Sequence, residues 1–276
     1  MIARLRSWWW LLGRVLFAVA TALWLAPIIL AITLSFRSNT AIDLSPLGRP
    51  NLAYVQNYVV AWSTGDMPTA LATSAVVVVV VWAWLVSAGA AGSYYVSRRG
   101  GWLARISFSV ILVGVMVPYV ARVFPLYRLM ADIGLAGNPF SVVIFQAGAL
   151  TPVTVLLYRS FLRRVPRDYE EAAAVEGATR WQTMRYVVLP QLRPATGAVM
   201  GITGMIMWND FFTPLLLLNG SRYETIPVRL FAFVGQYTTE WGEIFAMLVM
   251  GAVPVVALFL ALQRYLIAGL GSGVTG

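Results

Sequence analysis

The chain has 276 residues, of which 59% are hydrophobic and 11% charged, and its mean hydropathy is +0.75. A soluble domain carries about a quarter charged residues, so this composition is typical of an integral membrane protein. The absence of His and Cys excludes metal sites built on imidazole or thiolate, and Ser/His/Asp or Cys/His catalysis.

Basic residues are all arginine, and they give a formal net charge of +9. Without lysine the chain cannot contain the Gly-Lys-Ser/Thr of a phosphate-binding loop, so any ATP hydrolysis would belong to another subunit. The arginines lie between apolar segments and do not form one solvated basic face, which argues against a nucleic-acid partner.

Six segments are long and apolar enough to cross the hydrocarbon of a bilayer, which takes about 20 residues. They are residues 11–36, 69–96, 106–126, 140–158, 195–218 and 244–267. We interpret the first as a retained helix, because its apolar run is too long for a signal peptide and no small-residue cleavage site follows. The sequence therefore predicts an all-α integral membrane protein with six transmembrane helices.

The arginines also predict the orientation of these spans. With the N-terminus inside, 14 arginines fall on the cytoplasmic side and six on the other side. Because cytoplasmic loops carry the excess of Lys and Arg, both termini are expected in the cytoplasm. The two long outer loops, 37–68 and 219–243, contain turn residues and aromatics that favour ordered loops with short helices.

The cytoplasmic segment 159–194 has the densest charge in the chain. Asp168 with Glu171 three residues later is a capping pattern, and Gly177 supplies a left-handed helix stop. Thr179 with Gln182 repeats the capping pattern and predicts a second helix.

That second helix is expected to run to about Val188, with Pro190 preventing its continuation. The small side of the first helix could let a partner approach closely, so the segment could be a knob that inserts into a partner's cleft. It could equally fold back on its own bundle, with Arg163, Arg164 and Arg167 near anionic headgroups.

Two sets of motifs carry a family resemblance. Glu171-Ala172-Ala173, Glu176-Gly177-Ala178 and, after eight residues, Val187-Val188-Leu189-Pro190 resemble the EAA loop of ABC-importer permeases. Glu176 stands where Asp is usual and Val187 where Ile is usual. The stretches Trp208-Asn209-Asp210-Phe211, Thr225-Ile226-Pro227-Val228 and Trp241-Gly242-Glu243 are similar to the MalG-type permeases of carbohydrate importers.

This resemblance implies the type I ABC importer permease fold and a multi-pass protein of the bacterial cytoplasmic membrane. It implies three kinds of partner: a MalF-like second permease, two copies of a cytoplasmic ATPase that binds the ATP and magnesium, and an extracytoplasmic solute-binding protein or lipoprotein. The chain itself would be neither an enzyme nor a holder of cofactors. ATP-driven closure of the ATPase would move the docked EAA helix as a lever for alternating access.

The resemblance also assigns the coupling residues and the organisation of the chain. The residues expected to contact or shape the ATPase contact are Glu171, Ala172, Ala173, Glu176, Gly177, Ala178, Leu189 and Pro190. Residues 1–66 would form the first helix and first outer loop, and residues 67–266 a core of five helices that includes the coupling loop 159–194. Residues 267–276 would form a cytoplasmic tail that touches the ATPase.

Asp210 is the one acidic residue expected well inside a span, and an intramembrane carboxylate is by default a functional hypothesis. With Trp208 and Asn209 it offers an aromatic surface and hydrogen-bonding groups suited to a sugar path. The alternative is that Asp210 pairs with Arg122 or Arg128 and only braces the bundle.

Two functional classes compete. The first is the permease of an ABC carbohydrate importer, with glycerol phosphates or polyols as alternative cargo. The second is a self-sufficient secondary transporter or channel, which normally needs several intramembrane carboxylates or paired broken repeats. A membrane enzyme lacks a catalytic constellation in this sequence.

Overall fold

The computed structural model describes residues 2–232 and 240–271, and every regular element in these ranges is a helix. This confirms the all-α prediction. The chain divides into two compact units. Unit 1 comprises residues 1–67 and 229–253, and unit 2 comprises residues 68–228 and 254–276. The helices α14 (Ile226–Ala232) and α15 (Trp241–Gly271) each contain residues of both units.

Unit 1 contains the first predicted span and the first outer loop. Its elements are α1 (Ile2–Ser35), α2 (Asn39–Leu44), the short 3₁₀ helix η1 (Leu52–Val55), α3 (Gln56–Ser63) and the first part of α15. Short helices therefore order the outer loop, as its turn residues predicted.

Polar side chains hold that loop together. The buried guanidinium of Arg37 donates to the carbonyls of Ala41 at 2.7 Å and Pro46 at 3.0 Å. The amide of Asn57 donates to the carbonyl of Ser35 at 2.9 Å, and Asn39 accepts the N–H of Gly242 at 2.8 Å. Since these side chains hydrogen-bond backbone groups across the loop, the loop can be ordered without a large apolar core.

Unit 2 contains most of the helices. They are α4 (Met67–Trp84), the π segment η2 (Leu85–Gly89), α5 (Ala90–Arg98), α6 (Trp102–Met116), α7 (Tyr119–Asp132), α8 (Pro139–Leu162), α9 (Asp168–Val175), α10 (Arg180–Gln182), the π segment η3 (Thr183–Val188), α11 (Leu189–Gln191), α12 (Arg193–Trp208), α13 (Phe212–Leu217) and the last part of α15.

Helix α8 contributes to both hydrophobic clusters of unit 2. In the first, Val142 and Phe145 of α8 pack with buried side chains of α4, α7, α12 and α13. In the second, Tyr158 and Leu162 of α8 pack with α5, η3 and the start of α12. The close approach of η2 to α8 depends on Gly89, because a Cβ there would overlap the side chain of Thr154.

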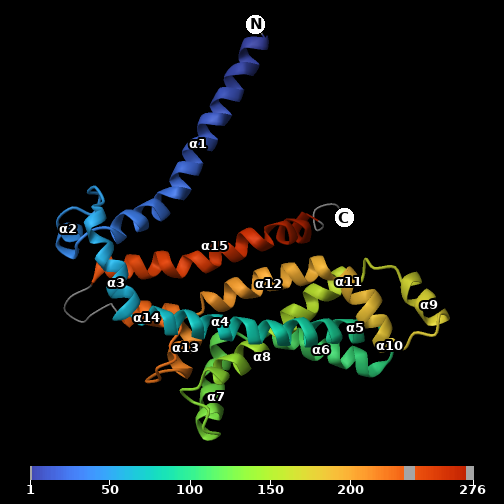
Figure 1. The fold of residues 1–276 in the computed structure, drawn as a ribbon. Coiled ribbons are helices and arrows are strands. Elements are labelled where there is room, and N and C mark those ends of the chain that lie inside the picture. The colour runs from blue at the N-terminus through green and yellow to red at the C-terminus, as the bar shows by residue number, and fades with distance from the viewer. Residues whose placement is uncertain (1, 233–239, 272–276) are drawn as a thin grey trace. The chain divides into compact units, whose positions relative to one another are not determined.

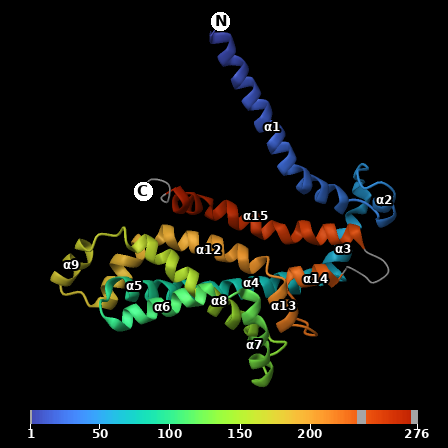
Figure 2. The ribbon, with the colours of Figure 1, turned by 180° about the vertical axis from the view of Figure 1, so that it is seen from behind.

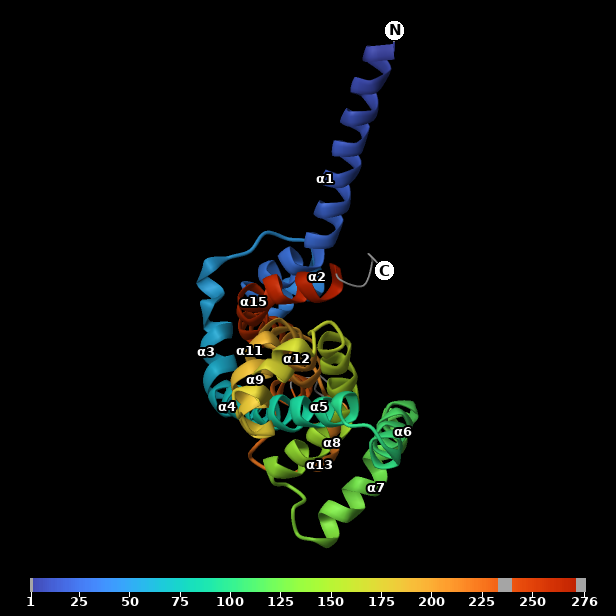
Figure 3. The ribbon, with the colours of Figure 1, turned by 90° about the vertical axis from the view of Figure 1, so that its right-hand side faces the viewer.

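Among the described residues, four helical stretches are long and apolar enough to span a membrane: Leu12–Ser35, Met67–Arg98, Pro139–Leu162 and Trp241–Tyr265. They match four of the six predicted spans. The prediction of a continuous third span was wrong, because α6 and α7 meet at 100°, a steep bend that Figure 3 shows. If this pair counts as one broken span, the structure gives up to five.

The third span breaks because Pro118 follows Val117, whose backbone is extended with φ −69° and ψ 122°. A residue before proline is disfavoured in the helical region. The prediction of one helix over 195–218 was also wrong, since α12 ends at Trp208 and α13 begins at Phe212. Pro214 explains this break, because in a continuous helix its ring would clash with the carbonyl of Asp210. The count of six spans and the cytoplasmic termini stay predictions.

Candidate functional site

Helix α9 of the segment 159–194 lies at one end of unit 2, next to α5 and α10 (Figures 1 and 2). None of its residues is buried, and Val175 is 87% exposed. Tyr169, Glu171 and Ala172 are exposed as well. Most of the surface of α9 is therefore accessible within the described chain.

The end of α9 is closed by main-chain hydrogen bonds. The N–H of Gly177 donates to the carbonyl of Ala174 at 3.0 Å, and the N–H of Ala178 donates to that of Ala173 at 2.9 Å. With a φ of +83° at Gly177, these two bonds form a Schellman cap. The predicted left-handed stop at Gly177 is confirmed, and the EAA spacing supplies the residues of this cap.

The start of α9 differs from the prediction that Asp168 caps it. The cap position is Arg167, which makes no side-chain capping bond, and Asp168 is the first residue inside the helix. Arg167 already has helical dihedrals, so the carboxylate of Asp168 is not placed to accept the orphan N–H groups. Asp168, Glu170 and Glu171 instead lie in the first turn, where negative charge favours the helix dipole.

The second helix begins as predicted and ends later than predicted. The N–H of Thr179 donates to Oε1 of Gln182 at 2.7 Å, and Oγ1 of Thr179 accepts the N–H of Gln182 at 3.3 Å, which confirms the capping box. The expected stop at Pro190 was wrong, because helical geometry continues through η3 and α11 to Gln191. Pro190 therefore lies inside a continuous run of helical residues, directly after the π segment η3.

The two interpretations of the loop, a knob or a fold-back, apply to different helices. Val188 and Leu192 are buried in the second hydrophobic cluster, and Leu189 packs against it. The second helix therefore folds back onto the bundle, whereas α9 is exposed. Arg163, Arg164 and Arg167 are exposed side chains.

The structure adds Glu170, which the motif did not indicate. Its Oε1 lies 2.7 Å from Nε of Arg98, and its Oε2 accepts the hydroxyl of Tyr94 at 2.9 Å. Tyr94 and Arg98 are both on α5. The only signal in the sequence was an arginine at the end of the second span, because the EAA pattern begins one residue after Glu170.

Asp210 lies in the break between α12 and α13 and joins several helices. Its carboxylate accepts hydrogen bonds from the hydroxyl of Tyr119 on α7, 2.9 Å from both oxygens, and from the amide of Gln146 on α8 at 2.5 Å. It also accepts the N–H of Thr213 at 3.3 Å, and the Thr213 hydroxyl hydrogen-bonds Tyr119. Asp210 forms no ion pair in the described part of the chain, so it is held by neutral groups and not by Arg122 or Arg128.

The structure places the other two residues of the predicted sugar path beside Asp210. Asn209 is exposed, and its amide donates to the carbonyl of Met205 at 2.8 Å. Trp208 is half-buried and packs against the first hydrophobic cluster. Of the three, Asn209 is therefore the side chain most open to a solute.

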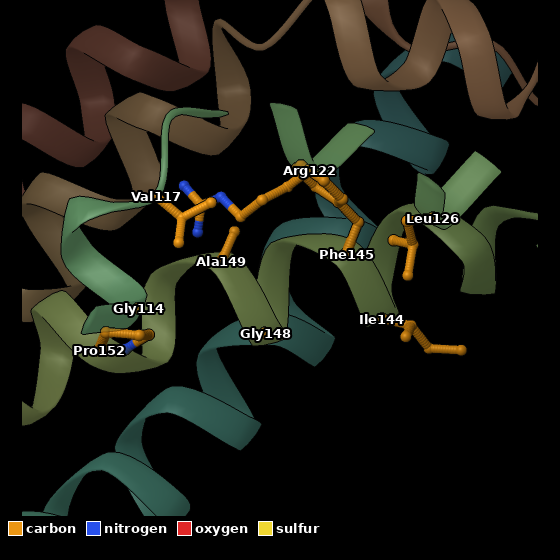
Figure 4. A pocket seen from close by; sticks show the side chains of 9 residues that line it. All are labelled: Gly114, Val117, Arg122, Leu126, Ile144, Phe145, Gly148, Ala149 and Pro152. Atoms are coloured by element: carbon orange, nitrogen blue, oxygen red, sulfur yellow. The ribbon is translucent and has the colours of Figure 1, made fainter. Parts of the chain in front are cut away.

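A cavity of about 270 Å³ lies where the α6–α7 bend faces α8. Its lining residues are Gly114, Val117, Arg122, Leu126, Ile144, Phe145, Gly148, Ala149 and Pro152. Figure 4 shows the guanidinium of Arg122 reaching toward Val117 and Ala149. Phe145 also packs edge-on against Tyr119 with ring centroids 5.3 Å apart, so this cavity adjoins the Asp210 cluster.

Comparison with known proteins gives one family and several relatives. Residues 85–271 match the family described as binding-protein-dependent transport system inner membrane component. The chain is 29% identical to the multiple sugar-binding transport system permease MsmG of Streptococcus mutans over 94% of each chain. It is 29% identical to the trehalose/maltose permease MalG of Thermococcus litoralis over 95% of this chain and 94% of the relative.

A third relative is the melibiose/raffinose/stachyose import permease MelC of Bacillus subtilis, 28% identical over 79% of each chain. Among solved structures, a chain of a bacterial ABC transporter that imports the acidic polysaccharide alginate superposes with a TM-score of 0.79 at 21% identity, covering 92% of this chain and 95% of that one. This likeness shows that the two chains share a fold.

Proposed function

Because the chain belongs to the binding-protein-dependent transport system inner membrane components, a family of multi-pass cytoplasmic membrane proteins, we propose that it is the carbohydrate-carrying permease of an ABC importer. One observation supports this best: a short helix bears the EAA residues, exposes most of its side chains and ends in a Schellman cap at Gly177. Such an exposed, firmly closed helix suits a contact with a soluble subunit.

The proposed partners are a second permease, two copies of a cytoplasmic ATPase that holds ATP and magnesium, and an extracytoplasmic solute-binding protein. Ala172 and Ala173 let the ATPase approach the helix backbone closely. Glu171 is exposed and contacts arginine or backbone amides of the ATPase. Glu176, Gly177 and Ala178 fix the end of the helix, while Leu189 and Pro190 belong to the segment that leads back to the bundle.

We further propose the division of the chain into residues 1–66, a core over 67–266 and a tail over 267–276 that touches the ATPase. Residues 272–276 of this tail lie outside the described residues.

The proposed cargo is a carbohydrate. The relatives are named for melibiose, raffinose and stachyose, and for trehalose and maltose. On this chain, Asn209 and Trp208 contribute to the sugar path, and Asp210 fixes the break that presents them. Amide and indole groups match the hydroxyls and apolar faces of a sugar.

The test is purification of the tagged chain from native membranes in mild detergent. Co-purification of an ABC ATPase and a second permease supports the proposal, and reconstitution with the cognate binding protein then measures ATP-dependent uptake. The probes are melibiose, raffinose, maltose and trehalose, with glycerol 3-phosphate and mannitol as the alternative cargo classes. A chain that transports alone, driven by an ion gradient and without an ATPase, would instead be a secondary transporter.

A further inference from the structure

Helix α9 has few direct attachments to the membrane helices of unit 2. None of its eight residues is fully buried, and the element it packs against is η3 of the same loop. Within the described chain, Glu170 is the side chain of α9 that makes polar contacts with a membrane helix. The direct polar connection between α9 and the spans is therefore made by Glu170.

Glu170 meets a branched set of contacts centred on Arg98. Nε of Arg98 lies 2.7 Å from Oε1 of Glu170, and both side chains are largely buried, 12% and 14% exposed. Nη2 of the same guanidinium donates to the carbonyl of Val165 at 2.8 Å and to that of Leu162 at 3.3 Å. We call Tyr94, Arg98, Glu170 and these two carbonyls the Arg98 junction.

The junction joins three parts of the chain at one planar group. Arg98 and Tyr94 belong to the last two turns of α5, the Leu162 carbonyl belongs to the end of α8, and Glu170 belongs to α9. The N–H donors of a guanidinium lie in one rigid plane and point in fixed directions. One arginine can therefore hold two partners in a defined geometry, whereas the ammonium group of a lysine on its flexible side chain cannot.

The contact between the two charges is specific. Nε of Arg98 and Oε1 of Glu170 are both buried, and neither makes a hydrogen bond within the described chain, so their 2.7 Å ion pair is the polar contact on which both rely. Each atom therefore depends on the other, and separating them would leave two buried charges uncompensated. Arg99, next to Arg98, and Asp132 at the end of α7 are exposed by contrast.

We propose that the Arg98 junction is a positioning device that fixes the coupling helix α9 to the inner ends of α5 and α8, so that the three move as one body when the partner ATPase closes. This rests on the proposed function, since it assumes that α9 docks on an ATPase. Glu171 contacts the ATPase, and Glu170, one residue away, passes the displacement to the spans. Glu170 is a positioning residue and touches neither the ATPase nor the cargo.

The test compares two double variants in the assembled importer. R98Q/E170Q removes the junction without leaving an unpaired charge, and R99Q/D132N makes the same charge changes at exposed residues outside α9. Both variants should retain the ATPase on purification. Uptake of the four sugars per ATP hydrolysed should fall at least about fivefold in R98Q/E170Q, the low end of coupling between sites, and stay at the unmodified value in R99Q/D132N.

Rescue by a covalent tether separates coupling from a general loss of structure. The chain contains no cysteine, so R98C/E170C introduces the only two thiols in this subunit. Uptake per ATP should be low in this variant, recover when a reducible bifunctional thiol reagent joins the pair, and fall again on reduction. The unmodified importer, treated in the same way, is the control.

A direct readout does not depend on the cargo. Spin labels at S160C on α8 and V175C on α9, both exposed positions, report the distance between these helices in the assembled complex. R98Q/E170Q should broaden the distance distribution, and R99Q/D132N should leave it unchanged.

Three results for R98Q/E170Q would contradict the proposal. The first is an unchanged distance distribution between the spin labels, and the second is unchanged uptake per ATP hydrolysed. The third is loss of the bound ATPase, which would make Glu170 a docking residue. If the unmodified importer binds the ATPase but takes up none of the four sugars, the proposed cargo is wrong. The spin-label distances, which do not depend on the cargo, then test by themselves whether the Arg98 junction positions α9.

Discussion

Helix α9, which carries Glu170, and helix α13, which Asp210 precedes, lie at opposite ends of unit 2 (Figures 1 and 2), and the two acidic side chains have contrasting surroundings. Glu170 pairs with the guanidinium of Arg98, whereas Asp210 accepts hydrogen bonds from the neutral groups of Tyr119, Gln146 and Thr213. Removing one member of a buried ion pair leaves a charge behind, and removing Asp210 leaves only neutral donors. Substitution of Glu170 is therefore expected to cost more stability than substitution of Asp210, although both residues are acidic.

We expect the largest effect from a substitution in the ion pair of Glu170 and Arg98. In Glu170→Ala, the buried Nε of Arg98 loses its counter-charge, and breaking such a pair costs about 3 kcal/mol. Thermal unfolding of the purified complex should show a clear loss of stability. R98Q/E170Q should recover most of this loss, because it leaves no unpaired charge. If Glu170→Ala and R98Q/E170Q were equally stable, the loss would not come from an unpaired charge, and Glu170 would not differ from Asp210 in this respect.

A second prediction concerns the Schellman cap at the end of α9, which the variants of the Arg98 junction do not change. Gly177→Val places a β-branched residue at a φ of +83°, which costs about 2 kcal/mol of local strain. We expect membrane insertion to persist while the ATPase no longer co-purifies and ATP-dependent uptake stops.

Gly100→Val is the control for this variant, because Gly100 lies in a loop with open space and without the left-handed conformation. Normal uptake by the Gly177→Val protein would show that the Schellman cap is dispensable for coupling.

A third prediction tests the neutral brace. In Asp210→Asn, the amide oxygen can still accept the bonds of Tyr119 and Thr213, so the loss should be about 1 kcal/mol, near that of one ordinary hydrogen bond. The unfolding temperature should fall much less than in Glu170→Ala. A fall as large as that of Glu170→Ala would mean that the charge of Asp210 has a partner outside this chain.

The smallest expected effect concerns the second loop helix. Thr179→Ala removes one half of the capping box, which costs about 1 kcal/mol or less. Because Val188 and Leu192 hold this helix on the bundle, uptake should change little. Hydrogen exchange should instead increase locally over α10, and a strong loss of uptake would show that this cap also contributes to coupling.

The sequence predicted the local features of the site well where they depend on neighbouring residues. The left-handed stop at Gly177 and the capping box of Thr179 and Gln182 are short-range, so spacing alone indicates them. The capping role of Asp168 failed because the helix starts one residue earlier than the pattern suggested. The stop at Pro190 failed because helical geometry passes from the π segment η3 through Pro190 to Gln191, and the pattern of residues does not reveal a π segment.

Composition and arginine placement, together with the motifs, were enough to indicate an all-helical membrane permease and its family, since hydrophobic length and loop charge are summed properties of the chain. The tertiary structure alone revealed the steep bend at Pro118, the break that contains Asp210, and the choice of Glu170 over Glu171 as the residue that meets Arg98. Residues 98 and 170 are far apart in the chain, and only packing of α5, α8 and α9 brings a guanidinium within 2.7 Å of one particular carboxylate oxygen. Long-range pairing of this kind leaves no periodic trace in a single sequence, because it depends on which face of each helix turns toward its neighbours.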